Sequence, residues 1–257
     1  MKRLALITAV CGATLLLAGV AQGESERVGN IIVSFDGRFA PHVLPRDREV
    51  PVTVDISGRL RTADGEPPPP LRRMSFAVDR HGKLSAQGLP VCEAGRLEST
   101  SSDEALARCR GALVGKGGFG ANVDFPDLEF PVEGKLLAFN TRARGRPAIA
   151  LHIYGANPIK ATFVLILHIH HPAKGTFGTV LSTRIPKLAA DLGYVTDFSL
   201  SFGRRYRHRG EARSFISARC AAPAGFPGAL FNFVRGSFTF ANGKTVTTTL
   251  ARDCVVR

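Results

Sequence analysis

The feature that most constrains the fold of this chain is a succession of short strand-like segments, most of them bounded by glycine or proline. Residues 50–56 show the pattern most clearly, because every even position is Val or Ile and every odd position is not. This two-residue period is typical of a half-buried β-strand. The segments of this character are 30–35, 50–56, 74–78, 120–125, 134–140, 148–154, 161–171, 176–184, 193–207, 212–220, 236–240 and 244–252. About a dozen short strands predict an all-β fold, either an antiparallel β-sandwich or a distorted barrel.

Three pairings of neighbouring strands are predicted from the connections between these segments. Ala241-Asn242-Gly243 separates two of them, and Asn-Gly is the strongest short hairpin signal. His208-Arg209-Gly210 is a second turn, which predicts a long hairpin of 193–207 with 212–220. The four prolines of 67–70 cannot donate backbone hydrogen bonds, so they form a stiff extended connector. The strands that flank this connector are predicted to pair with each other.

Only one or two short helices are predicted. Ser101 and Glu104 stand three residues apart, which is the spacing of a capping box at a helix N-terminus. Helix-forming residues follow as far as Cys109, and Gly111 can end the helix. A second helical turn is predicted over 186–191, where a proline stands early and a glycine follows.

The N-terminus has the three parts of a secretory signal peptide. Lys2 and Arg3 give a positive start, residues 4–20 carry no charge, and Ala21 and Gly23 are small residues at the positions before a cleavage site. The prediction is a signal peptide over 1–23 and one β-sandwich domain over 24–257. The alternative is an uncleaved anchor, although the uncharged run is at the short limit for spanning a bilayer. The protein is therefore expected to be secreted, in the extracellular space or the cell envelope.

Removal of the signal peptide leaves an even number of cysteines and a basic chain. Cys11 is lost, and the formal net charge falls from +13 to +11 because Lys2 and Arg3 are lost with it. An even cysteine count in an exported chain indicates disulfides. Four cysteines allow three connectivities, and proximity favours Cys92–Cys109 and Cys220–Cys254. Zinc binding is the alternative, but the chain has no CxxC-type pair.

Several short motifs resemble an uncharacterised family of secreted, β-rich proteins from high-GC actinobacteria. They are Gly88-Leu-Pro-Val-Cys92, Ala105-Leu-Ala-Arg-Cys109 with Gly111-Ala-Leu-Val-Gly115, His152-Ile-Tyr-Gly155, Gly193-Tyr-Val195, Cys220-Ala-Ala-Pro-Ala-Gly-Phe226, and Ser237-Phe-Thr-Phe240 before Cys254. The resemblance spans most of the chain after residue 23 and implies export and a β-rich fold. It implies no catalytic residue, because no activity is assigned to the family. The histidines at 168, 170 and 171 are not part of its pattern.

The densest basic stretch of the chain, 203–213, is a candidate anion-binding site. Guanidinium groups form bidentate hydrogen bonds with phosphate, sulfate and carboxylate groups, and two arginine-rich faces with a tyrosine between them could hold such groups. The candidate residues are Arg204, Arg205, Tyr206, Arg207, Arg209 and Arg213. The alternative is a solvated hairpin tip. The expected partners are an anionic cell-wall polymer, lipid headgroups or another exported protein, and nucleic acid is not expected outside the cell.

Three histidines form a candidate metal site. His168 and His170 share one face of a strand, and His152 on a neighbouring strand could supply a third ligand for Zn or Cu. The alternative is a strand end that emerges from the core into solvent. No carboxylate follows closely to complete the site.

The sequence contains no GxSxG or HExxH motif. The acidic residues Asp124, Asp127, Glu129 and Glu133 could include a glycosidase pair, but a solvated loop around Pro126 and Pro131 is the favoured explanation. The prediction is therefore an exported non-enzymatic protein without a cofactor, a binding or structural module of the cell exterior with a basic surface. The alternative is a metal-dependent hydrolase or metal-binding protein that uses the three histidines.

Overall fold

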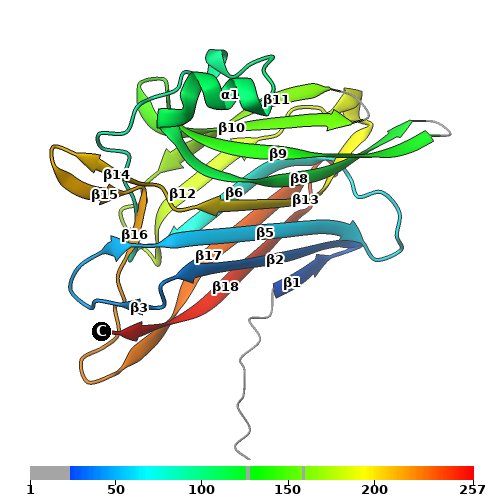
Figure 1. Ribbon diagram of the computed structural model, residues 1–257. Coiled ribbons are helices and arrows are strands. Elements are labelled where there is room, and N and C mark those ends of the chain that lie inside the picture. The colour runs from blue at the N-terminus through cyan, green and yellow to red at the C-terminus, as the bar shows by residue number, and fades with distance from the viewer. Residues whose placement is uncertain (1–23, 126–127, 158–159) are drawn as a thin grey trace, which may run out of the picture.

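A computed structural model describes residues 24–125, 128–157 and 160–257, and the segment predicted as a signal peptide lies outside these residues (Figure 1). Most of the described chain is strand. The strands are β1 (Glu24–Val28), β2 (Ile31–Ala40), β3 (Val43–Leu44), β4 (Val50–Pro51), β5 (Thr53–Thr62), β6 (Leu71–Asp79), β7 (Gly82–Leu84), β8 (Leu113–Phe125), β9 (Leu128–Ala143), β10 (Arg146–Asn157), β11 (Ala161–His170), β12 (Phe177–Arg184), β13 (Gly193–Phe202), β14 (Arg205–His208), β15 (Glu211–Ser214), β16 (Ile216–Ala218), β17 (Gly228–Phe240) and β18 (Thr245–Val256). The helical elements are α1 (Ser102–Cys109) and the short 3-10 turns η1 (Ala94–Arg96), η2 (Arg110–Ala112) and η3 (Ala189–Asp191).

Thirteen of the strands form one sheet in the order β1-β2-β5-β13-β8-β9-β10-β11-β12-β6-β17-β18-β3. Each neighbouring pair is antiparallel except β18 and β3, which run parallel. Two small sheets, β14-β15 and β4-β16-β7, complete the described strands. The predicted all-β class is confirmed, with the difference that the large sheet is mixed and not purely antiparallel.

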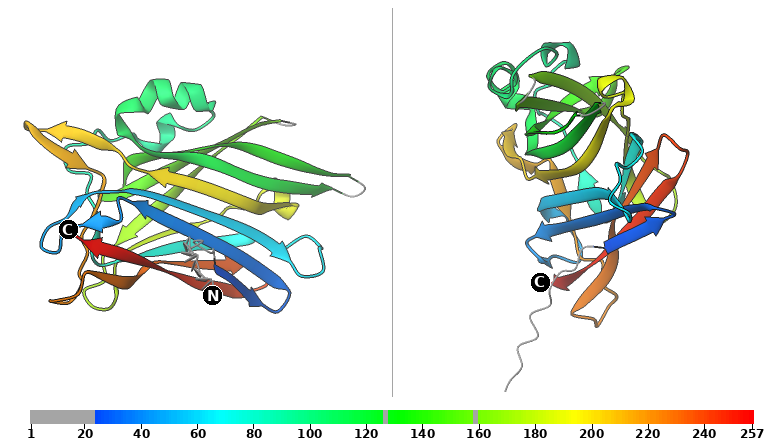
Figure 2. Two further views of the ribbon diagram at one scale, coloured as in Figure 1. Left: turned by 60° about the horizontal axis from the view of Figure 1, so that its bottom comes forward. Right: turned by 90° about the vertical axis from the view of Figure 1, so that its right-hand side faces the viewer.

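The large sheet curls so that strands from its two ends meet, and α1 lies outside the curl (Figure 2). The backbone N–H of Ala251 on β18 donates to Glu24 Oε1 on β1 at 3.4 Å. Arg252 on β18 reaches β2, where its Nε donates to the Gly37 carbonyl at 2.7 Å and its Nη2 to Asp36 Oδ1 at 2.8 Å. The sequence left open two architectures, a β-sandwich and a distorted barrel. The structure has a single sheet curled on itself, which corresponds to the second of these.

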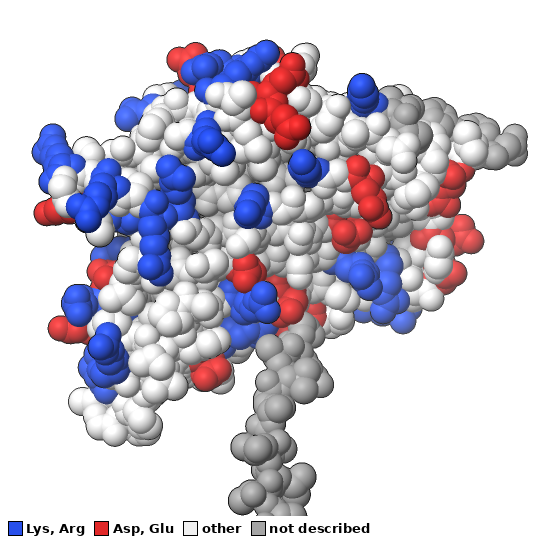
Figure 3. All heavy atoms as spheres, in the orientation of Figure 1, with Lys and Arg blue, Asp and Glu red and all other residues white. Residues whose placement is uncertain are grey.

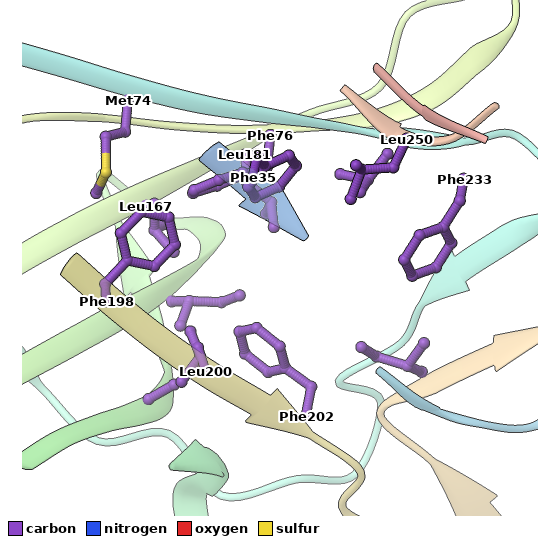
Figure 4. Packing of buried hydrophobic residues seen from close by; sticks show 14 of the residues in the cluster. Phe35, Met74, Phe76, Leu167, Leu181, Phe198, Leu200, Phe202, Phe233 and Leu250 are labelled. Atoms are coloured by element: carbon purple, nitrogen blue, oxygen red, sulfur yellow. The ribbon is translucent and has the colours of Figure 1, made fainter. Parts of the chain in front are cut away.

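Apolar residues fill much of the interior of the curl. Phe35, Phe76, Phe198 and Phe238 come from β2, β6, β13 and β17, and in five of their six pairs the ring centroids lie 5.8 to 6.1 Å apart. Figure 4 shows the first three of these rings. Aromatic rings at these separations pack favourably. Strands that are far apart in the sequence therefore share one core.

A second, smaller core lies on the outer face of the sheet, beneath α1. The predicted capping box is present, because Ser101 Oγ accepts from the Glu104 N–H and Glu104 Oε2 accepts from the Ser101 N–H. The bond from the Ser101 backbone N–H, and after it a bond from the Ser101 hydroxyl to Glu104 Oε2, lower the pKa of Glu104. The second core consists of Cys92, Leu97, Ala105, Cys109, Ala112, Leu137, Phe139 and Ala150.

Both predicted disulfides are formed. Cys92 and Cys109 are joined with their Cα atoms 5.6 Å apart, and Cys220 and Cys254 with theirs 5.7 Å apart. The first attaches α1 to the segment before it, and the second attaches the chain after β16 to β18. Within the described residues, no helix is long and apolar enough to cross a membrane.

The predicted pairings have different outcomes. β17 and β18 form the hairpin expected from Asn242-Gly243, and β14 and β15 pair across His208 to Glu211. The prediction that 193–207 pairs with 212–220 over its whole length is wrong beyond this tip, because β13 pairs with β5 and β8 instead. The strands on either side of residues 67–70 do not pair, since β5 joins β2 and β13 while β6 joins β12 and β17. The second helical turn is reduced to η3.

Candidate functional site

The principal candidate site is an apolar cavity of about 320 Å³ inside the curl. Its wall comes from β5, β6, β8, β9, β10, β11, β12 and β13 and from residues 185–192, which connect β12 to β13 and are called the strap below. Figure 4 shows Met74 of β6, Leu167 of β11, and Phe198 and Leu200 of β13 pointing into the interior. The aromatic part of the wall is Phe76, Phe119, Phe130, Phe163, Phe198 and Phe202.

Strand alternation places these side chains. On β11, Phe163, Leu165 and Leu167 occupy alternate positions and line the cavity, as a two-residue period requires. On β13, Val195 and Phe198 both line it although they are three residues apart. The pairing of β13 with β8 shifts register between Val195 and Asp197. This irregularity resets the alternation, so the apolar positions on both sides of it face inward.

Asn122 is the one side chain in the described wall that carries a hydrogen-bonding group. Its Nδ2 donates to Tyr194 Oη at 3.1 Å and also to Glu129 Oε1, so both of its N–H donors are used. Tyr194 donates to the same carboxylate. Burial, followed by this bond, raises the pKa of Tyr194 to about 12, and the bonds from Tyr194 and Asn122 lower the pKa of Glu129. Of the acidic residues considered as a glycosidase pair, Glu129 thus makes structural hydrogen bonds. Asp127, another of them, lies outside the described residues.

The strap has an unusual backbone. Ala189, Ala190 and Asp191 have φ values of 44°, 55° and 78°, which is the left-handed region that residues other than glycine rarely adopt. The Leu188 carbonyl holds the turn, because it accepts from the N–H groups of Asp191 at 2.9 Å and Gly193 at 3.0 Å. A Cβ atom on Gly193 would lie 2.8 Å from the Leu188 Cβ, so glycine permits this close approach.

Ion pairs hold the strap at its polar end. Asp191 Oδ1 accepts from Arg72 Nη2 at 2.5 Å, and Asp191 Oδ2 lies 3.2 Å from Lys187 Nζ. Both cations lower the pKa of Asp191, with Arg72 the larger cause. Leu188 and Ala189 of the same strap line the cavity. The strap therefore contributes side chains both to the apolar wall of the cavity and to a charged cluster, and these side chains are only a few residues apart in the sequence.

The candidate anion-binding residues do not form one groove. Arg205, Arg207 and Arg209 are exposed on the projecting hairpin, where Figure 3 shows Lys and Arg side chains gathered at the left edge. Tyr206 lies on the other face of the hairpin, since its Oη donates to the Gln87 carbonyl at 2.8 Å. Arg213, opposite Tyr206, donates to Glu211 Oε2 at 2.5 Å. Arg204 is half-buried where the hairpin joins the body, and its carbonyl accepts from the Phe215 N–H.

The three candidate metal ligands are not brought together. His152 is fully buried in contact with Thr100, and its Nε2 lies 3.0 Å from the Thr100 carbonyl oxygen. His168 and His170 are exposed. His152 pairs with Val164, four positions along β11 from His168, which is roughly 13 Å of strand. No group of three potential metal ligands converges within the described residues.

Comparisons with known proteins give no assignment: no family model, no curated protein and no solved structure matches the chain. Sequence reasoning missed the cavity, because inward apolar positions look the same whether they fill a core or line a void. The available signal was the apolar alternation on several consecutive strands.

Proposed function

We propose that this protein is an exported, non-enzymatic binding protein and that its ligand is an apolar molecule held in the cavity. The observation that carries the proposal is the combination of volume and chemistry: about 320 Å³ bounded by apolar side chains, with the amide donors of Asn122 already used. Small-molecule pockets commonly have volumes of about 300 to 1,000 Å³ and mostly apolar walls.

Water is a poor occupant of such a space. Each water takes about 30 Å³ and needs two to four polar partners, which this wall does not offer. Leaving the cavity empty would also be unfavourable, by several kcal/mol at roughly 24 cal/mol per Å³. An apolar ligand removes both penalties, since it restores van der Waals contact with the wall.

Export and the absence of catalysis are supported by separate features. Two disulfides fit an oxidising compartment, as does the signal-peptide pattern of residues 1–23. The described wall presents no nucleophile, acid or base to a ligand in the cavity. The exposed arginines of the β14–β15 hairpin would add adhesion to anionic polymers or headgroups. Retention on an anionic resin that disappears with added salt would support this, and failure to bind at low salt would contradict it.

The test of cavity binding uses N-phenyl-1-naphthylamine, a neutral apolar dye that fluoresces in apolar surroundings. The wild-type protein is expected to bind it saturably. Leu165→Trp places an indole in the cavity and is expected to weaken dye binding at least tenfold. His168→Trp on the same strand is the matched control, because position 168 is exposed and its variant should bind as the wild type does. A wild-type protein that binds no dye, or equal binding by both variants, would overturn the proposal.

A further inference from the structure

We infer that the ligand is a single-chain amphiphile with an anionic head, whose chain fills the cavity and whose head binds Arg72 and Lys187 at the strap. The inference rests on the function proposed above, which requires only that something apolar occupies the cavity. It adds the chemistry of the polar end and the place where that end lies.

Arg72 is the first part of the argument. One of its two terminal nitrogens, Nη2, donates to Asp191. The other, Nη1, is buried and has no hydrogen-bond partner among the described residues. A buried guanidinium N–H without an acceptor is unfavourable, and a carboxylate or phosphate oxygen is the acceptor that guanidinium binds best. The site therefore lacks an anionic oxygen beside Asp191.

The charge balance at the strap points the same way. Two cations, Arg72 and Lys187, share the single carboxylate of Asp191. Each oxygen of that carboxylate faces one cation, and neither oxygen accepts a hydrogen bond from Arg72 Nη1. An incoming anionic head would give the group a second negative charge and neutralise the pair of cations.

The position of Arg72 connects this charge to the cavity. Its carbonyl accepts from the Ile185 N–H at 2.9 Å, and Ile185 lines the cavity. Met74, two residues further along β6, also lines it. The guanidinium itself binds Asp191 of the strap to which Ile185 and Leu188 belong, so a chain lying against these two residues would have its end near the guanidinium.

The volume sets the chain length. A cavity of about 150 Å³ accommodates benzene, so about 320 Å³ suits roughly a dozen carbon atoms. Dodecanoate is the corresponding carboxylate. Dodecanol and dodecyltrimethylammonium carry the same chain with a neutral and a cationic head.

The experiment measures displacement of N-phenyl-1-naphthylamine by these three compounds at pH 8, below their micellar concentrations. On the wild-type protein, dodecanoate is expected to displace the dye at a concentration at least tenfold lower than dodecanol, and dodecyltrimethylammonium to be the weakest. Arg72→Gln should lower the preference for carboxylate over alcohol about tenfold, which corresponds to about 1.4 kcal/mol. Lys187→Gln should lower it less, because Lys187 is the more exposed cation.

Arg73→Gln is the matched control, since Arg73 is the adjacent residue on β6 and is exposed. It should leave the preference unchanged, and Arg72→Lys should retain part of it. Dye binding without a head-group preference in the wild type overturns this inference and leaves the proposed function intact. Equal preference in the Arg72→Gln and Arg73→Gln proteins does the same. A wild type that binds no dye overturns both. If Arg72→Gln does not fold, the wild-type series still decides the outcome.

Discussion

The two faces of β9, β10 and β11 show how the same apolar alternation leads to different results. On the outer face, Leu137 and Ala150 pack beneath α1 in the second core. On the inner face, Leu136, Leu151 and Leu165 line the cavity. Both sets are buried, and both come from neighbouring positions on the same strands. The difference lies in what covers each face.

The outer face is covered by a short helix fixed close to the sheet. The Cys92–Cys109 disulfide ties α1 down, and Leu97 and Ala105 fill the space beneath it. The inner face is covered by the rest of the curled sheet. Large curled sheets enclose space that their side chains do not fill, whereas small ones are filled completely. Three experiments test this contrast, beginning with the largest expected effect.

Truncation of one leucine on each face measures the contrast directly. Leu137→Ala on the outer face should lower the free energy of unfolding by about 4 kcal/mol, because it leaves a cavity in a packed core. Leu151→Ala on the inner face should lower it by about 2 kcal/mol, since part of that side chain already faces empty space. The two residues are 5% and 3% exposed, so burial does not separate them. Denaturant unfolding gives both values, and equal losses would refute the contrast.

Removal of the disulfide beneath α1 should have the next largest effect. Replacing both Cys92 and Cys109 with Ala should lower the free energy of unfolding by about 3 kcal/mol, as expected for a loop of this length. The cavity lies on the other face, so dye binding by the folded protein should be retained. Parallel measurements of denaturant unfolding and dye binding check this. Loss of dye binding in a protein that is still folded would show that the two faces are coupled.

The free energy of unfolding should depend on pH through the protonation of His152, the buried histidine on the outer face. Burial lowers the pKa of His152 below its ordinary value of 6.5, and its Nδ1 has no partner among the described residues. Below pH 6.5 the unfolded chain therefore binds a proton that the folded protein does not. Stability should fall as the pH drops from about 7 to 5, by at most about 1.4 kcal/mol per pH unit from this group.

Unfolding of the wild type and of His152→Gln across this range isolates the contribution. The variant should have the shallower slope, although it is less stable at pH 7 because it loses the bond to Thr100. His170→Gln removes an exposed histidine and serves as the control. Identical slopes for the wild type and His152→Gln would show that this residue does not contribute.

Local features of the fold could be predicted because the residues that form them are close in the chain. The capping box joins residues three apart, and the β17–β18 hairpin closes over a few residues at Asn242-Gly243. Both disulfides join the cysteines nearest in sequence. In each case the physical cause is local backbone geometry or a short loop closure.

Pairings across long stretches of chain were decided only by the tertiary structure. β5 and β6 are separated by a short proline connector, yet each pairs elsewhere because the curl places other apolar strands beside it. His152 and His168 share a face, but the register of β10 on β11 keeps them apart.

The sequence by itself determined the strands, the helix cap, the cysteine pairs and the inward apolar positions. Closure of the sheet decided that these positions enclose a cavity and that Arg72 meets Asp191 of the strap. The physical reason is that alternation fixes which side chains point inward, whereas the distance between opposite walls depends on how the whole sheet curls.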